Sequence, residues 1–317
     1  MARNPDPRLS IELAGIPLRS PILLAAGTAG FSDELADVLD LSQVGAVVSK
    51  SITREPRAGN ETWRVWPTKA GMLNAIGLAN PGIDAFMADI APRLRSTPTT
   101  VFGSIAGTSV EDYAHVARHM DTLEQLPAVE INVSCPNVHG GTEFGADAGA
   151  LRELVTAVRA ELRQTKLIVK LSPIAVGQPT LSAIARAAIE SGADALTIAN
   201  TVPAMQIDVE TRRPVLSNVT GGLSGPAIHP IAVKLVHDVY RSIAREAGVP
   251  IIGAGGVSAW DDAAEFILAG ASAIEMGTAL FADPRAPVRM NRQLSRWLNT
   301  HRVHAVKDLV GQVILPG

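Results

Sequence analysis

The segment PIIGAGGVSAWDDAAEFILAGASAIEMGTALF, residues 250–281, decides the fold class. A short apolar run ends in a group of glycines, an amphipathic stretch follows, and a second apolar run again ends at a glycine. A strand, a glycine-rich turn and a helix that leads into another strand form the repeating unit of a parallel α/β sheet. The number of copies of this unit along the chain indicates how many strands the sheet has.

Eight apolar or β-branched runs of this kind occur along the chain, most of them followed by polar or glycine-rich residues and an amphipathic stretch. They are PILLAAG (21–27), GAVVSKS (45–51), TVFGSIAG (100–107), AVEINVSCPN (128–137), LIVKLSP (167–173), ADALTIANT (193–201), PIIGAGGV (250–257) and AIEMGTALF (273–281). Eight almost wholly apolar strands predict a closed (β/α)8 barrel, the TIM barrel. Counting strands alone leaves a doubly wound open sheet as the alternative.

Three segments outside the eight runs also carry predictions. LSIELAGIPLRS (9–20) predicts an N-terminal β-hairpin that turns at Ala14-Gly15 and plugs the barrel floor. SVEDYAHVARHM (109–120) predicts a helix capped by Ser109. Two connections, from about residue 53 to 82 and from about 202 to 226, exceed ordinary βα loops, and the middle of the second resembles a two-stranded excursion. Long loops on the top face of a barrel usually cover a site.

Composition favours one large domain. A chain of 317 residues could hold two average domains, but barrels use this length as one, and no Gly/Ser or Pro linker interrupts a chain that is 47% hydrophobic and 19% charged. We therefore predict a single domain over residues 1–317. The net charge of -3 and the scattered basic residues argue against a nucleic acid or an anionic membrane as partner.

The termini and the cysteine count bear on location and metal content. The N-terminal MARNPDPRLSIELAG has no signal core, and no later stretch reaches the roughly 18 uninterrupted apolar residues of a spanning helix, so a cytoplasmic location is expected. The single cysteine excludes an intrachain disulfide and the CxxC spacing of structural zinc or iron–sulfur sites. We expect no metal in this chain.

Polar residues and glycines stand at the predicted carboxyl ends of the strands, which meet at one mouth in a barrel. They are Gly27-Thr28, Lys50-Ser51, Ser104, Asn132 to Asn137, Lys170, Asn200-Thr201, Gly255-Gly256 and Gly277-Thr278. GAGG (253–256) and MGTA (276–279) close the last two strands, where barrels often bind phosphate through backbone N–H groups. The alternative is that these glycines only make tight turns.

Lys50 and Lys170 end apolar strands, where an inward ammonium needs an anionic or polar partner. An electron-rich cofactor and an acidic substrate would supply such partners, whereas the alternative is that both lysines snorkel at the barrel rim. Lys234 and Lys307 lie in helical surface patterns and are expected to be solvated.

The only cysteine, Cys135, lies in INVSCPNVHGGTEFG (131–145). Its polar flanks favour a reactive thiol, acting as base or nucleophile, over an inert core residue. His139 is a possible base partner, although loop histidines are commonly solvated. Asn74, Asn132, Asn137 and Asn200 each offer a donor and an acceptor, which suits an imide or amide ring, although Asn is also a common turn residue.

From about Leu9 to Pro284 the chain resembles the class 1 dihydroorotate dehydrogenases. The resemblance is carried by SKSIT (49–53), GMLNAIGLANPG (71–82), EINVSCPN (130–137), VKLSP (169–173), IANT (198–201), GGLSGPAIHP (221–230), IIGAGGV (251–257) and EMGTALF (275–281). Within that family, MLNAIGLANPG and TGGLSGPAIHP resemble the catalytic subunit of class 1B. Ala199 departs from the pattern, since Ile or Leu is common there.

The resemblance implies a bound FMN and the oxidation of dihydroorotate to orotate in pyrimidine synthesis. Cys135 would remove the C5 proton while hydride passes from C6 to flavin N5, Lys50 would lie near the flavin and the substrate carboxylate, and Lys170 near flavin N1 and O2. Substrate positions would be Lys50, Asn74, Ala75, Ile76, Gly77, Leu78, Asn132, Asn137, Asn200 and Thr201. FMN positions would be Gly27, Lys50, Ser51, Ser104, Asn132, Lys170, Ala199, Gly225, Gly255, Gly256, Gly277 and Thr278.

The resemblance also implies a partner subunit that carries FAD and a [2Fe–2S] cluster and delivers electrons to NAD. The expected assembly is a homodimer, within a heterotetramer when that subunit is present. Three rivals remain at this point: an FMN barrel of the dihydropyrimidine dehydrogenase type, a non-redox barrel that binds a sugar phosphate, and an inactive barrel that serves as a binding subunit.

Overall fold

The computed structural model describes residues 5–134, 144–174 and 176–316. Eight parallel strands close into a barrel in the order β10-β15-β16-β3-β4-β7-β8-β9. Their bounds are β3 (Ile22–Leu24), β4 (Ala46–Val48), β7 (Thr100–Ile105), β8 (Ala128–Asn132), β9 (Lys166–Lys170), β10 (Ala195–Ile198), β15 (Ile251–Ala254) and β16 (Ala273–Met276). The predicted barrel is confirmed, and the open-sheet alternative is wrong. Each strand lies within or close to its predicted run, and the polar ends of the runs form the turns beyond the strands.

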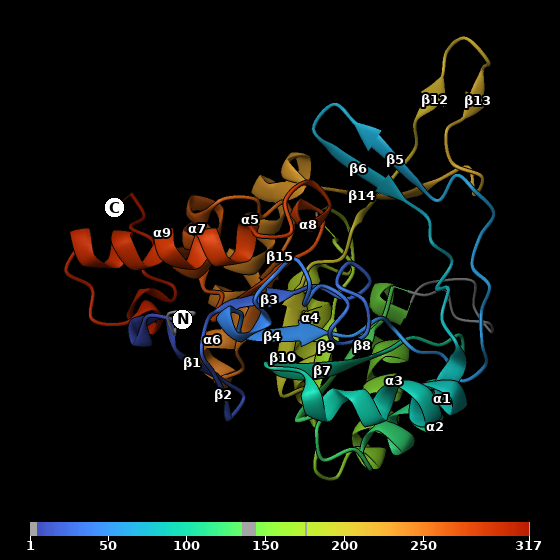
Figure 1. Ribbon diagram of the computed structural model, residues 1–317, viewed down its shortest axis with the longest axis horizontal. Coiled ribbons are helices and arrows are strands. Elements are labelled where there is room, and N and C mark those ends of the chain that lie inside the picture. The colour runs from blue at the N-terminus through green and yellow to red at the C-terminus, as the bar shows by residue number, and fades with distance from the viewer. Residues whose placement is uncertain (1–4, 135–143, 175, 317) are drawn as a thin grey trace.

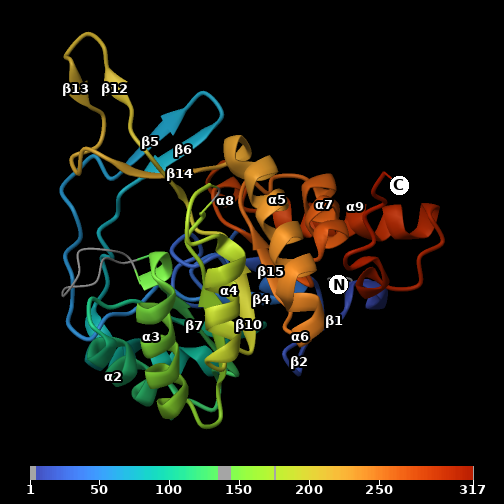
Figure 2. The same cartoon turned by 180° about the vertical axis from the view of Figure 1, so that it is seen from behind.

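Helices surround the barrel (Figures 1 and 2). The longer ones are α2 (Val110–Met120), α3 (Ala148–Glu161), α4 (Leu181–Glu190), α5 (His229–Val239), α7 (Trp260–Ala269) and α9 (Ala286–Thr300), and the short ones are α1 (Gly82–Ala85), α6 (Arg245–Ala247) and α8 (Ala279–Ala282). The short 3-10 or π helices are η1 (Pro7–Leu9), η2 (Leu41–Gln43), η3 (Phe86–Ile90), η4 (Ala91–Ser96), η5 (Phe144–Ala146), η6 (Pro226–Ile228), η7 (Tyr240–Ala244) and η8 (Val306–Leu309). No helix in the described segments has the length and apolar character needed to cross a bilayer.

Helix α2 shows how the sequence sets a helix in this fold. The Ser109 hydroxyl accepts a hydrogen bond from the N–H of Asp112 and caps the first turn, as predicted. Acidic residues occupy the first turn and Arg118 and His119 the last, which complements the helix dipole. Tyr113 and Val116 lie on the face that is buried against the barrel.

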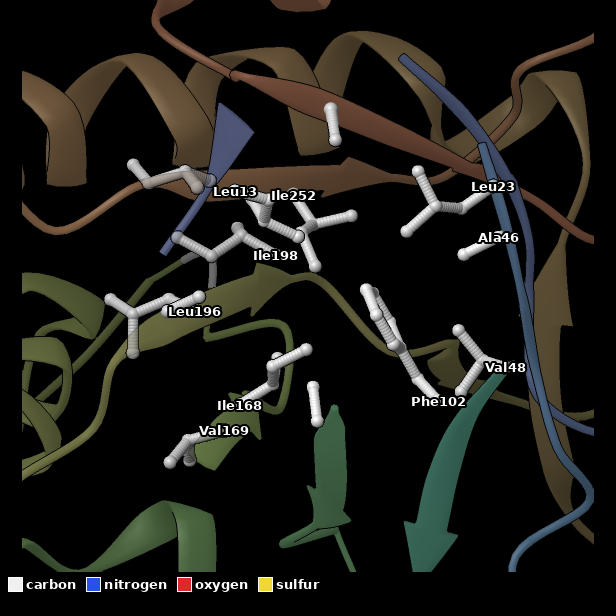
Figure 3. Packing of buried hydrophobic residues seen from close by; sticks show 14 of the residues in the cluster. Leu13, Leu23, Ala46, Val48, Phe102, Ile168, Val169, Leu196, Ile198 and Ile252 are labelled. Atoms are coloured by element: carbon white, nitrogen blue, oxygen red, sulfur yellow. The ribbon is translucent and has the colours of Figure 1, made fainter. Parts of the chain in front are cut away.

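The barrel strands are buried on both faces and contribute to one large hydrophobic core. Figure 3 shows Leu23, Phe102, Ile168 and Ile252 from different strands in this cluster, together with Leu13 from outside the barrel. Leu13 belongs to the antiparallel hairpin of β1 (Ile11–Leu13) and β2 (Ile16–Leu18), which turns at Ala14-Gly15 as predicted. Its fully buried side chain places the hairpin against the barrel core.

The two long connections pair with each other to form a second sheet. Its order is β11 (Val202–Ala204), β14 (Gly221–Ser224), β6 (Gly71–Asn74) and β5 (Val65–Thr68), and β12 (Ile207–Asp208) with β13 (Arg213–Pro214) forms the predicted two-stranded excursion. Figures 1 and 2 show this sheet at one end of the barrel, with the β12–β13 hairpin projecting beyond it. The pairing of β6 with β14 is antiparallel and joins residues about 150 positions apart, which sequence reasoning did not predict.

Candidate active site

A cavity of about 490 Å³ lies where the carboxyl ends of the barrel strands meet the second sheet. Most of the predicted site residues line it: Gly27, Lys50, Ser51, Asn74, Ile76, Leu78, Asn132, Lys170, Ala199, Asn200, Thr201, Gly225, Gly255, Gly256, Gly277 and Thr278. Convergence of residues from so many strand ends on one hollow is the arrangement of a barrel active site. Cys135, Asn137 and His139 lie outside the described residues.

Three predicted residues, Ser104, Ala75 and Gly77, are not among those that line the cavity. Ser104 is fully buried, and its hydroxyl is 2.9 Å from that of Ser51, which does line the cavity. Ala75 and Gly77 belong to the loop after β6, where the carbonyl of Ala75 accepts a hydrogen bond from the Asn60 side chain. Ser104 thus contacts a cavity residue, and Ala75 and Gly77 alternate along the chain with Asn74, Ile76 and Leu78, which line the cavity.

Glycines at one end of the cavity bring backbone close to backbone. Gly225, Gly255 and Gly256 have positive φ angles of 90°, 134° and 70°. A Cβ atom on Gly256 would lie 2.7 Å from Cβ of His229 and 2.8 Å from the carbonyl oxygen of Gly225. Only glycine fits this turn. Gly225, Gly255 and Gly256, which we call the glycine cradle, are therefore required by close packing and not only by turn formation.

His229 helps to fix this cradle, although its sequence position on a helix gave no functional signal. The ring is buried, and Nδ1 lies 3.0 Å from the carbonyl oxygen of Gly255. Nε2 faces carboxylate oxygens of Asp262 and Glu265 at 3.7 and 3.4 Å. The imidazole therefore connects the glycine turn to α7.

The cradle is also tied to the second sheet. Thr278, just after β16, donates a hydrogen bond from its hydroxyl to the Ser224 hydroxyl at 2.8 Å. Ser224 in turn donates to the carbonyl oxygen of Met72 at 3.2 Å. The end of the last barrel strand and the long connections are thus held in one hydrogen-bonded chain.

Amide side chains gather on another wall. The Asn200 amide donates to Asn132 Oδ1 and to the Ser134 hydroxyl, both at 3.0 Å, and Asn200 Oδ1 accepts from the N–H of Thr201 at 2.8 Å. Asn74 comes from the second sheet and donates to the carbonyl oxygen of Gly222 at 3.1 Å. Hydrogen bonding orients these amides. A ring with alternating C=O and N–H groups could form further hydrogen bonds with them.

Lys50 is a partly buried cation on the cavity wall. Burial lowers its pKa, the positive charge of Arg64 adds to the effect, and no carboxylate in the described segments offsets it. An anionic group in the cavity would relieve this unfavourable environment.

Lys170 already has its anionic partners within the chain. Its Nζ lies 2.5 Å from Glu275 Oε2 and 3.4 Å from Glu130 Oε1, and the Thr197 hydroxyl donates to Glu130 Oε2 at 2.6 Å. Desolvation opposes the charge on Lys170, but the attraction of Glu130 and Glu275 raises its pKa overall. The lysine is only 8% exposed, so the snorkelling alternative is wrong for Lys170.

Glu275 has the most perturbed carboxyl group of this cluster. Burial, together with the neighbouring Glu130 carboxylate, raises the pKa of Glu275 to about 8 against the attraction of Lys170. Sequence reasoning missed both glutamates. The available signal was an acidic residue among apolar neighbours in each of two strands, AVEIN and AIEM, because a buried acidic residue needs a partner.

Comparisons with known proteins agree on one family. Residues 8–298 match the family model described as dihydroorotate dehydrogenase. Curated relatives named "Dihydroorotate dehydrogenase B (NAD(+)), catalytic subunit" include one from Geobacter sp. (strain M21), 44% identical over 310 residues and covering 98% of this chain and 99% of the relative. Another is from Bacteroides thetaiotaomicron, 42% identical over 304 residues and covering 96% and 98%.

A solved structure is similar over nearly the whole chain. It is described as dihydroorotate dehydrogenase (DHODH) from Eimeria tenella in complex with ferulenol, and it superposes with a TM-score of 0.83 at 25% identity. The match covers 98% of this chain and 90% of that one.

Proposed function

The chain belongs to the dihydroorotate dehydrogenase family, and from this premise we propose that it oxidises dihydroorotate to orotate in pyrimidine biosynthesis, as the catalytic subunit of an NAD-linked enzyme. The observation that carries the proposal is 44% identity over 98% of the chain to a relative named as that subunit. The cavity supports it, because its cations and amides suit an acidic, imide-containing ring.

FMN is the proposed cofactor, and the cavity offers it a fitting set of residues. The turn at Gly225, Gly255 and Gly256 leaves no room for a side chain and offers backbone to a phosphate. The cavity is also lined by Lys170 and by Glu275, whose buried Oε1 has no hydrogen-bond partner among the described residues. FMN would supply the hydride acceptor when bound. Lys170 would then place positive charge beside the ring that takes up electrons.

The substrate pole is proposed around Lys50 and the amides. Lys50 lacks a carboxylate partner in the described segments, so the carboxylate of dihydroorotate would be its counter-ion. Asn74, Asn132 and Asn200 would hydrogen-bond the imide. Together these contacts would orient the substrate and select against uncharged pyrimidines.

Cys135 is the proposed base that removes the C5 proton, a role that the family resemblance supplies. It follows Ser134, whose hydroxyl accepts a hydrogen bond from Asn200 at the cavity wall. A base of this kind must be able to lose its proton in the covered site before it accepts one from the substrate.

Electron transfer to NAD is proposed to require a second subunit with FAD and a [2Fe–2S] cluster. This chain has one cysteine, whereas such a cluster needs four protein ligands, usually thiolates. We propose a homodimer of this chain, completed to a heterotetramer by that partner, in the cytoplasm.

An anaerobic visible spectrum of the FMN-reconstituted chain tests the proposal. Dihydroorotate should bleach the flavin band, and Cys135→Ala should slow the bleaching by about 100-fold or more, the contribution typical of a general base. Dihydrouracil, which lacks the carboxylate, is the control substrate. Bleaching by dihydrouracil without bleaching by dihydroorotate would favour the dihydropyrimidine dehydrogenase type. Failure to bind FMN would overturn the redox assignment.

A further inference from the structure

Three buried ionisable side chains form the floor of the cavity. Glu130 is on β8, Lys170 on β9 and Glu275 on β16, and they are 0%, 8% and 1% exposed. One ammonium therefore serves two carboxyl groups. With all three groups ionised the cluster would hold one uncompensated negative charge, which is costly in a site shielded from water.

The two carboxyl groups are not equivalent. Glu130 has a partner on each oxygen, since Oε1 faces Lys170 and Oε2 accepts from the Thr197 hydroxyl. Glu275 contacts Lys170 through Oε2, its carboxyl lies within side-chain hydrogen-bond reach of Glu130 if one of the two is protonated, and its buried Oε1 has no hydrogen-bond partner among the described residues. A bare carboxylate oxygen in this position is unfavourable, whereas a protonated one is neutral and can donate into the cavity.

No other strand beside Glu275 supplies a compensating charge. Its backbone neighbours are Ala254 on β15 and Leu23 on β3, both apolar. Two further cations line the cavity: Lys50, after β4, which has no carboxylate partner in the described segments, and Arg289, which pairs with Asp283. The titratable groups that face Glu275 across the barrel are therefore Lys170 and Glu130.

We propose that Glu275 is a positioning residue that carries a proton in the resting enzyme and so keeps the cavity floor electrically neutral. The presence of this proton is inferred from Glu130, Lys170 and Glu275 alone, whereas its effect on a flavin rests on the proposed function. When Glu275 ionises and releases its proton to solvent, Lys170 is shared between two anions. Its positive charge is then less able to stabilise negative charge gained by a ring above it.

Infrared spectroscopy of the flavin-free chain tests the proton directly. Wild-type protein with isotope-labelled glutamate should show the carbonyl stretch of a protonated carboxylic acid below about pH 8, and the band should fade above that pH. Glu275→Gln should lack the band, whereas Glu153→Gln, at an exposed position on α3, should keep it. A spectrum without the band in wild-type protein overturns the proposal.

The midpoint potential of bound FMN, measured against pH, tests the consequence. On the acid side of pH 8 the wild type and Glu275→Gln should have closely similar potentials, because both have a neutral group at this position. On the alkaline side the wild-type potential should fall below that of Glu275→Gln. A difference in midpoint potential between wild type and Glu275→Gln that stays constant across the pH range would contradict the proposal.

Glu130→Gln keeps the test decisive if Glu275→Gln fails to fold. With Glu130 neutral, Glu275 becomes the only carboxylate next to Lys170 and should lose its proton, so the infrared band should disappear near neutral pH. Persistence of the band would overturn the proposal. If the chain binds no FMN at all, the proposed function fails while the infrared result still decides the state of Glu275.

Discussion

Two lysines at equivalent strand ends have opposite electrostatic environments. Lys170 is held by Glu130 and Glu275, which raise its pKa, whereas Lys50 is desolvated without an acid in the described segments and has a lowered pKa. Lys170 is therefore a fixed part of the cavity floor. Lys50 can gain a counter-ion only from a ligand, which is why it is the residue on which anion recognition is expected to depend.

Replacement of Lys50 by Gln should weaken the binding of orotate about ten- to a hundredfold, since a hydrogen bond to a charged group contributes about 1.5–3 kcal/mol. Titration of the flavin spectrum with orotate measures this change. Lys234→Gln, at an exposed position in an ion pair with Asp238, is the matched control and should leave the affinity unchanged. Equal affinities for Lys50→Gln and wild type would remove Lys50 from the substrate site.

Glu275 should make the stability of the chain depend on pH. Its pKa is raised from the ordinary 4.5 to about 8 in the folded state, so between these values the native protein binds more protons than the unfolded chain. The free energy of unfolding contributed by this group therefore falls as pH rises through that window and stays low above it.

Glu275→Gln cannot ionise and should lose that slope, so the variant gains stability relative to wild type as pH rises towards 8. Urea denaturation at a series of pH values measures the difference, with Glu153→Gln as the control. A difference in unfolding free energy that does not change over this window would show that Glu275 is ionised throughout.

At the scale of elements, the turn between β15 and α7 is the most constrained part of the site. Gly255 and Gly256 pack against α5, where Cβ atoms of Ala232 and His229 occupy the space that side chains would need. The turn can therefore not be remodelled without moving α5. This rigidity suits a site that must present backbone N–H groups in a fixed arrangement.

Gly256→Ala should destabilise the chain by about 1–3 kcal/mol and reduce FMN affinity, because the new Cβ is strained at φ 70° and collides with His229. Gly248→Ala is a matched control: its φ is 66°, but nothing lies within 4 Å of the added Cβ. That variant should lose some stability and keep its FMN affinity. Quenching of FMN fluorescence measures the FMN affinity, and urea denaturation measures the stability. Equal FMN affinities for Gly256→Ala and wild type would contradict the role of the turn.

At the scale of the molecule, the barrel provides one end of the cavity and the second sheet the other. The main hydrophobic core extends through the barrel and its helices, while Leu73, Val215 and Leu216 form a small separate cluster under the second sheet. We propose that residues 1–317 act as one domain. The substrate contact proposed for Asn74 would then depend on the pairing of β6 with β14 that joins the two long connections.

The chain alone should oxidise dihydroorotate with an artificial electron acceptor but should not reduce NAD. It has one cysteine and no GxGxxG turn between a strand and a helix, so it lacks the groups expected to pass electrons to a nicotinamide. Assay of NADH formation with and without a co-expressed FAD/iron–sulfur subunit measures this dependence. NADH production by the purified chain alone would contradict the two-subunit arrangement.

The sequence by itself determined the barrel, the N-terminal hairpin, helix α2 and many of the polar residues and glycines that line the cavity. These features follow from local patterns: apolar runs that end in glycine, Ser109 before an acidic first turn, and polar residues at strand ends that a parallel barrel brings to one mouth. The family resemblance added Ile76, Leu78, Ala199 and Gly225 to the predicted site and supplied the role proposed for Cys135, which lies outside the described residues.

Only the tertiary structure decided which distant residues meet. The pairing of β6 with β14, the contact of His229 with Gly255, and the cluster of Lys170 with Glu130 and Glu275 all join separate elements. The sequence of a strand shows which of its residues are apolar or charged. Where a buried charged side chain points, and which side chain it meets, depends on strand order and register in the closed barrel. That is why the sequence predicted a partner for Lys170 outside the chain, while the fold placed two carboxyl groups beside it.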